Sequence, residues 1–152
     1  MINTVLNRWH LERVGMKRFI LATHAYMSKG IKSSLDLILG NQVDLSIYCV
    51  YVDDQPNIGP VVEKEIEEHK DDEFIIMTDL FGGSVNNELL ALTDRGNIHL
   101  VAGVNLVLVL SLLLNIPNCE DVSSEIRHCV EEAKSGIVYC NDIQIDSELD
   151  EL

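Results

Sequence analysis

Aromatic side chains are scarce in this sequence, where Phe, Tyr and Trp together make up 5% of 152 residues. Hydrophobic residues nevertheless reach 47%, so the apolar content is mainly Val, Ile, Leu and Ala. A chain of this length and apolar content can bury a sizeable core and is expected to form one compact domain. Its aliphatic composition fits a parallel sheet covered by helices better than an all-β sandwich.

Basic residues are also few, because 11 Lys and Arg stand against 25 Asp and Glu, for a formal net charge of −14. Such a surface repels the phosphates of nucleic acids and anionic lipid headgroups, so neither is expected as a partner. A protein partner with a basic docking face fits this charge better. Part of the negative charge lies in residues 142–152, which are expected to form a solvated acidic tail.

The chain has four cysteines: Cys49, Cys119, Cys129 and Cys140. No two of them are spaced as C-x-x-C, so the sequence contains no recognisable metal knuckle or redox motif. We therefore predict no metal and no cofactor. This use of cysteine is typical of a reducing compartment such as the cytoplasm.

Long hydrophobic segments are missing as well. The most apolar stretch, residues 98–114, is short for a membrane span and contains glycine and polar residues, so direct membrane insertion is not expected. Residues 1–15 lack the pattern of a signal peptide. Because Met16-Lys17 and the apolar residues after it look like a natural start, we expect residues 1–15 to be a leader or an artificial extension.

Strands and helices are expected to alternate along most of the chain. Short apolar or β-branched segments predict strands at residues 17–22, 44–52, 73–78 and 97–102. Apolar residues at helical spacing predict helices at 30–39, 60–70, 85–93, 106–114 and 122–133, and a last short strand is expected at 137–140. The alternation indicates an α/β fold, with an open and mainly parallel four-stranded sheet of order 2-1-3-4 and helices on both faces.

The expected strand order also predicts where a functional site would lie. Ligands of an open parallel sheet bind beyond the carboxyl ends of the strands, where the strand order reverses. Here this point lies between the first and third strands, whose following segments contain His24 and Asp79. The carboxylate of Asp79 would fix the tautomer of the imidazole, and the other ring nitrogen would then be a nucleophile near neutral pH.

The segment after Asp79 suggests what this nucleophile acts on. A Gly82-Gly83 turn leads into a predicted helix with Ser84 as a candidate N-cap, and N–H groups at a helix N-terminus favour an anion such as phosphate. From the residues alone, a purely structural His–Asp contact remains open. So does a hydrolase triad of Ser84, His24 and Asp79, although Ser84 lacks the Gly-x-Ser-x-Gly setting of an exposed nucleophile.

Three segments resemble the signatures of mannose-family IIA proteins of the sugar phosphotransferase system (PTS). They are FILATHAYMSKG at residues 19–30, MTDLFGGS at 77–84 and VAGVNL at 101–106. Their order and spacing match the family, so we expect a domain of this type over residues 16–141. Two residues depart from the family pattern: Ala25 follows the histidine where glycine is usual, and Val85 follows Gly-Gly-Ser where proline is usual.

The resemblance implies a phosphohistidine carrier. His24 would accept a phosphoryl group from the phosphocarrier protein HPr and pass it to a IIB protein or domain, while Asp79 orients the imidazole. The phosphoryl site would be lined by Thr23, Gly82, Gly83 and Ser84.

The family also implies a cytoplasmic homodimer, in which residues 137–140 would cross to the partner's sheet. Two related functions remain open at this stage. One is the phosphocarrier subunit of a dihydroxyacetone kinase, and the other is a regulatory domain whose phosphorylation state is the signal.

Overall fold

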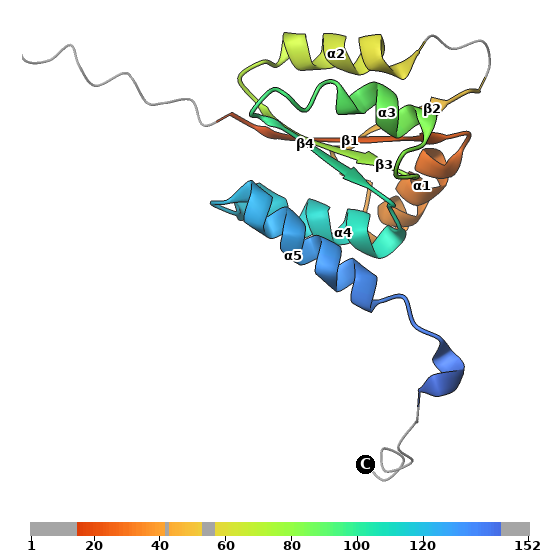
Figure 1. The fold of residues 1–152 in the computed structure, drawn as a ribbon. Helices are drawn as coiled ribbons and strands as arrows, with labels where there is room; N and C mark the ends of the chain where they lie inside the picture. The colour runs from red at the N-terminus through yellow and green to blue at the C-terminus, as the bar shows by residue number, and fades with distance from the viewer. Residues whose placement is uncertain (1–14, 42, 53–56, 144–152) are drawn as a thin grey trace, which may run out of the picture.

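The computed structural model describes residues 15–41, 43–52 and 57–143 of the chain. Its sheet has four strands in the order β2-β1-β3-β4, and every neighbouring pair is parallel (Figure 1). The strands are β1 (Lys17–His24), β2 (Ser46–Val50), β3 (Glu73–Thr78) and β4 (Ile98–Ala102). The order and direction expected from the sequence are confirmed.

Helices cover both faces of this sheet, as expected (Figure 1). One face carries α2 (Ile58–Glu68) and α3 (Ser84–Leu90). The other face carries α1 (Met27–Leu39), α4 (Leu106–Asn115) and α5 (Val122–Ser135). Two short 3-10 helices, η1 (Ile116–Asn118) and η2 (Cys140–Asp142), complete the described elements.

The central strand β3 explains why the sheet lies between two helical layers. Phe74 and Ile76 are fully buried in the cluster beneath α2 and α3, and Ile75 and Met77 are fully buried in the opposite cluster. Side chains of a strand alternate between its two faces, so an uninterrupted apolar run suits a strand buried on both sides. The same run fixes the position of Asp79, which follows directly at the carboxyl end of β3.

Helix α4 begins where the sequence predicts a buried helix and ends one residue later, at Asn115. The Asn105 side chain caps it by accepting a hydrogen bond from the Leu108 N–H at 2.8 Å. Leu108, Val109 and Leu112 are buried against the sheet. In the part of the chain that the structure describes, no helix is both long enough and apolar enough to cross a membrane.

Strand β1 extends two residues beyond the expected end at residue 22. His24 pairs with Val50 of β2, and the next N–H, that of Ala25, donates to the Val50 carbonyl at 2.9 Å. These contacts make His24 the last residue of a strand, where the sequence predicted the second residue of a loop. The backbone of the candidate nucleophile is therefore held by the sheet.

The strand expected at residues 137–140 does not form in the single chain. After α5, residues 137–139 have no regular structure and Cys140 begins η2, while the chain runs away from the domain (Figure 1). Ile137, Val138 and Tyr139 are all more than half exposed. A strand needs a neighbour for its backbone groups, and this segment lies beside none. Residues 1–14 and 144–152, with most of the expected leader and acidic tail, lie outside the described residues.

Candidate active site

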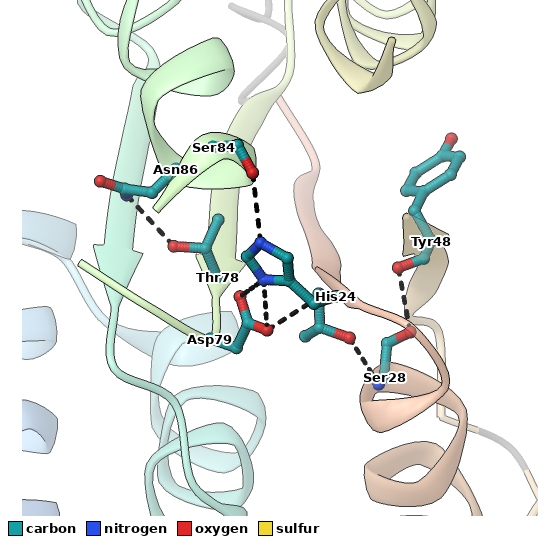
Figure 2. Close-up of polar contacts among 8 residues, drawn as sticks. His24, Ser28, Tyr48, Thr78, Asp79, Ser84 and Asn86 are labelled. Atoms are coloured by element: carbon teal, nitrogen blue, oxygen red, sulfur yellow. Dashed lines mark hydrogen bonds and ion pairs between the residues drawn. The ribbon is translucent and has the colours of Figure 1, made fainter. Parts of the chain in front are cut away.

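His24 and Asp79 meet at the carboxyl edge of the sheet, as the strand order predicted (Figure 2). The imidazole Nδ1 of His24 lies 2.8 Å from Oδ2 and 3.0 Å from Oδ1 of Asp79. The backbone N–H of His24 also donates to Asp79 Oδ2, at 2.9 Å. One carboxylate therefore holds both the main chain and the ring of the same histidine.

These contacts define the protonation pattern of the imidazole. A carboxylate can only accept, so Nδ1 carries the proton and Nε2 keeps its lone pair. Ser84 Oγ lies 3.2 Å from Nε2, where its hydroxyl can donate to that lone pair (Figure 2). The His24 side chain is 36% exposed while that of Asp79 is 11% exposed, so Nε2 is accessible and its orienting group is covered.

The charge of Asp79 is stabilised by His24. Partial burial alone would raise the pKa of Asp79, but the hydrogen bonds from the backbone N–H and ring of His24 outweigh burial and lower it. A carboxyl group with a lowered folded-state pKa stabilises the fold above its unfolded-state pKa. That contribution is lost as pH falls through the folded-state value. Asp79 is therefore an anion throughout the neutral range.

The Gly82-Gly83 turn is held by internal hydrogen bonds. The Gly82 N–H donates to Asn86 Oδ1 at 3.1 Å, Asn86 Nδ2 donates to Thr78 Oγ1 at 3.1 Å, and the Gly83 N–H donates to the Leu80 carbonyl at 3.1 Å. The two glycine N–H groups, expected to face an anion, are thus engaged within the turn. Asn86, which is 4% exposed, is a residue that the sequence analysis missed.

The glycines serve the site through their missing side chains. A Cβ atom at Gly83 would lie 3.3 Å from Cε1 of His24, which is closer than ordinary packing allows. Gly82 adopts φ of 74°, a conformation that glycine reaches without strain. Together they let the start of α3 approach the imidazole.

Two hydroxyl groups differ from their expected roles. The N-cap of α3 is Gly83, and Ser84 is the first helical residue, so its side chain faces His24 and does not cap the helix. Thr23 is fully buried, and its Oγ1 accepts a hydrogen bond from the Ser28 N–H at 2.7 Å. In this arrangement Thr23 holds the first turn of α1, whereas Ser84 is the hydroxyl beside Nε2.

Three further histidines, His69, His99 and His128, lie among the described residues, and His128 belongs to α5. His99 Nε2 pairs with Glu73 Oε1 at 2.9 Å at the amino end of β3, and His69 lies 4.0 Å from Asp72. Among residues 15–41, 43–52 and 57–143, no group of three or more His, Cys, Asp or Glu side chains is arranged to hold a metal ion.

Ala25 adopts φ of 48°, in the left-handed region that disfavours residues with a Cβ atom. We expect Ala25→Gly to raise the free energy of unfolding by about 1 kcal/mol, because glycine relieves this strain. Ala91, the C-cap residue that follows α3, has an ordinary φ of −62° and is the matched control. Ala91→Gly should lower the free energy of unfolding by about 0.5–1 kcal/mol. Urea denaturation measures both, and a destabilised Ala25→Gly variant would contradict the explanation.

Comparison with known proteins matches this chain to one family. The family model of the PTS system fructose IIA component, EIIA-man, matches residues 18–133. A structure from Klebsiella pneumoniae, described as a phosphoenolpyruvate-dependent sugar PTS permease, is 34% identical, with a TM-score of 0.78 over 86% of this chain and 95% of that chain.

Two further solved structures are similar. The phosphotransferase component EIIA from Streptococcus agalactiae is 25% identical, with a TM-score of 0.75 over 84% of this chain and 100% of that chain. The mannose/sorbose-specific IIA subunit from Enterococcus faecalis shares the fold at 20% identity, with a TM-score of 0.72 over 86% and 96% of the two chains. No curated protein matches the chain. Because the family model covers most of the domain, the chain belongs to the EIIA-man family of PTS IIA components.

Proposed function

We propose that the protein is a phosphohistidine carrier that accepts a phosphoryl group on Nε2 of His24. The observation that carries the proposal is the pairing of Nδ1 with Asp79, which leaves Nε2 accessible beside Ser84. Membership of the EIIA-man family supports a role in phosphotransfer. The geometry supports Nε2 as the atom that would take up the phosphoryl group.

In the accepting step, the lone pair of Nε2 attacks the phosphorus atom of a phosphohistidine on the donor. A nitrogen–phosphorus bond forms on His24 as the donor's bond breaks, and its electron pair stays on the donor's ring nitrogen. The Nδ1 proton remains hydrogen-bonded to Asp79, whose negative charge stabilises the positive charge developing on the imidazole. Transfer to the next histidine reverses these changes.

The Ser84 hydroxyl can change its hydrogen-bond acceptor during this step, from Nε2 to the phosphoryl group. Its hydroxyl lies 3.2 Å from Nε2 in the resting site and must release the lone pair when Nε2 attacks. A hydroxyl so close to the new bond can then donate to a phosphoryl oxygen. We therefore assign Ser84 to the phosphoryl site, with Gly82 and Gly83 providing the close approach of α3.

The donor and acceptor follow from the family. HPr is the proposed donor, a IIB protein or domain the proposed acceptor, and the cytoplasm the proposed location. We also propose a homodimer, because Ile137, Val138 and Tyr139 are exposed beyond the end of α5 and could pair with a second copy. Sedimentation velocity tests this, since it separates a 17.1 kDa monomer from a dimer of twice that mass.

The central experiment supplies the protein with phosphoenolpyruvate, enzyme I and HPr. We expect a phosphoryl adduct that is labile in acid and stable in base, as a phosphohistidine should be, and adding a IIB partner should discharge it. Labelling only by the donors of a dihydroxyacetone kinase would favour that alternative. Labelling without discharge to any IIB partner would favour a regulatory domain.

A serine hydrolase is a second candidate because Ser84, His24 and Asp79 form a hydrogen-bonded series. Two features count against it. Asn86 stands two residues after Ser84, where the Gly-x-Ser-x-Gly setting has glycine. The N–H groups of Gly82 and Gly83 already have internal acceptors. A fluorophosphonate probe that labelled Ser84 would favour the hydrolase; we expect no such labelling.

A further inference from the structure

Tyr51 lies directly beside the candidate nucleophile. Val50 is the register partner of His24, so the next residue of the chain is brought to the imidazole. The ring centroids of Tyr51 and His24 are 5.6 Å apart, and their planes are tilted by 38°. This distance is within the range of attractive aromatic contacts.

The Tyr51 side chain is held at its far end as well. Its hydroxyl donates to Glu88 Oε1 at 3.3 Å, and the other oxygen of Glu88 accepts from the Gly59 N–H at 3.2 Å. Glu88 belongs to α3, the helix that also presents Ser84 to Nε2. Tyr51 thus connects the end of β2 to the helix that forms the opposite side of the site.

The backbone of Tyr51 is strained in this position, with φ of 62°. A bulky residue rarely adopts the left-handed region, and such outliers persist where surrounding contacts require them. The contacts that hold Tyr51 are those with His24 and Glu88. The strain indicates that the contacts of the Tyr51 ring stabilise this position by more than the unfavourable backbone conformation costs.

We propose that Tyr51 is a positioning residue that clamps the His24 imidazole and shields its phosphorylated form from water. The hydrogen bond to Asp79 holds Nδ1 but still lets the ring pivot about that contact. A ring packed against the imidazole opposes this pivot and keeps Nε2 directed at Ser84. The same ring occupies space from which water could approach the nitrogen–phosphorus bond. The role rests on the proposed function of His24.

The test measures how fast the phosphorylated protein loses its phosphoryl group. The full chain is phosphorylated with phosphoramidate, a small donor that needs no protein partner, and the decay is followed by ³¹P NMR at neutral pH. Tyr51→Leu should lose the group about fivefold faster than the wild type. Tyr51→Phe keeps the ring and should stay within about twofold of the wild type.

Tyr26→Leu is the matched control, because Tyr26 is 59% exposed and Tyr51 is 57% exposed. It should decay at the wild-type rate. Leucine is unbranched at Cβ, so the substitution at Tyr51 leaves the backbone constraint comparable, and thermal unfolding verifies that each variant is folded. Long-range ¹H–¹⁵N spectra of the unphosphorylated imidazole provide a second measurement. They should show the Nδ1–H tautomer in both proteins, because Asp79 holds Nδ1, with shifted or broadened imidazole signals in Tyr51→Leu, where the ring is free to pivot.

Wild-type decay and an unchanged imidazole spectrum in Tyr51→Leu would overturn the clamp, as would equal acceleration in Tyr26→Leu. These outcomes are distinct from failure of the proposed function. If HPr did not label the wild type, the carrier role would fail, while the comparison of chemically phosphorylated variants would still decide the role of Tyr51.

Discussion

Replacing His24 with alanine is expected to reduce phosphoryl uptake from HPr to less than about one-thousandth of the wild-type rate. The substitution removes Nε2, the atom that we propose forms the new bond. Ser84 and Asp79 would remain, but a hydroxyl without its imidazole base is a poor nucleophile. Radiolabelled phosphoenolpyruvate with enzyme I and HPr measures the loss as initial rate of incorporation.

His99→Ala is the matched control for this substitution. His99 also pairs through its ring with a carboxylate, that of Glu73, at 2.9 Å, but it lies near the amino end of β4, beside the amino end of β3. The His99→Ala variant should therefore incorporate phosphoryl groups at the wild-type rate, while its free energy of unfolding falls. Incorporation that persisted in His24→Ala and disappeared in His99→Ala would move the site to the opposite end of the sheet.

The strand order and the meeting of His24 with Asp79 could be predicted because both follow from strong, simple patterns. The apolar run of β3 and the alternation of strands with helices specify a parallel sheet. In such a sheet, residues that follow neighbouring strands converge at one edge, whatever their separation in the sequence. This rule needs no knowledge of individual side-chain conformations.

The details that could not be predicted depend on local geometry. Whether the Gly82 N–H faces an anion or Asn86 is decided by the conformation of one turn, which composition does not reveal. Tyr51 was included in an expected strand, although its ring belongs to the site. An aromatic residue after β2, in a chain with few aromatics, was the available signal.

The missing strand at residues 137–140 has a different cause. Its apolar residues resemble a strand, but backbone pairing requires a neighbour that one chain does not supply. A pattern within one sequence can therefore indicate a strand without indicating where its partner lies.

Replacing Asp79 with asparagine is expected to slow phosphoryl uptake by at least about 100-fold, with His24 still in place. Oδ2 of Asp79 accepts from the His24 backbone N–H and from Nδ1, which also lies near Oδ1. An asparagine offers one acceptor oxygen, and if its amide group faces Nδ1 the imidazole must carry its proton on Nε2. The nucleophilic lone pair is then lost, together with the charge that stabilises the imidazolium.

Asp72→Asn is the matched control for Asp79→Asn, because Asp72 is also a hydrogen-bonded carboxylate. Its hydrogen bond with Arg18, at 2.6 Å, lowers its pKa below the ordinary value, and Asp72 lies at the amino end of the sheet. Asp72→Asn should lower the free energy of unfolding at pH values above the unfolded-state pKa of Asp72, where the native carboxylate is charged. Its rate of phosphoryl uptake should equal that of the wild type.

Asp79→Glu separates charge from geometry in the orientation of His24. It restores the negative charge on a longer side chain, so it should recover part of the rate lost in Asp79→Asn if charge stabilisation dominates. If the tautomer of His24 has the larger effect, the rate of phosphoryl uptake recovers only where the longer carboxylate again accepts from Nδ1. Long-range ¹H–¹⁵N spectra report this hydrogen bond directly. Rapid-quench measurements of the initial rate of phosphoryl uptake compare the wild type, Asp79→Asn and Asp79→Glu. An Asp79→Asn variant that labelled as fast as the wild type would show that the imidazole needs neither the charge nor the tautomer provided by Asp79.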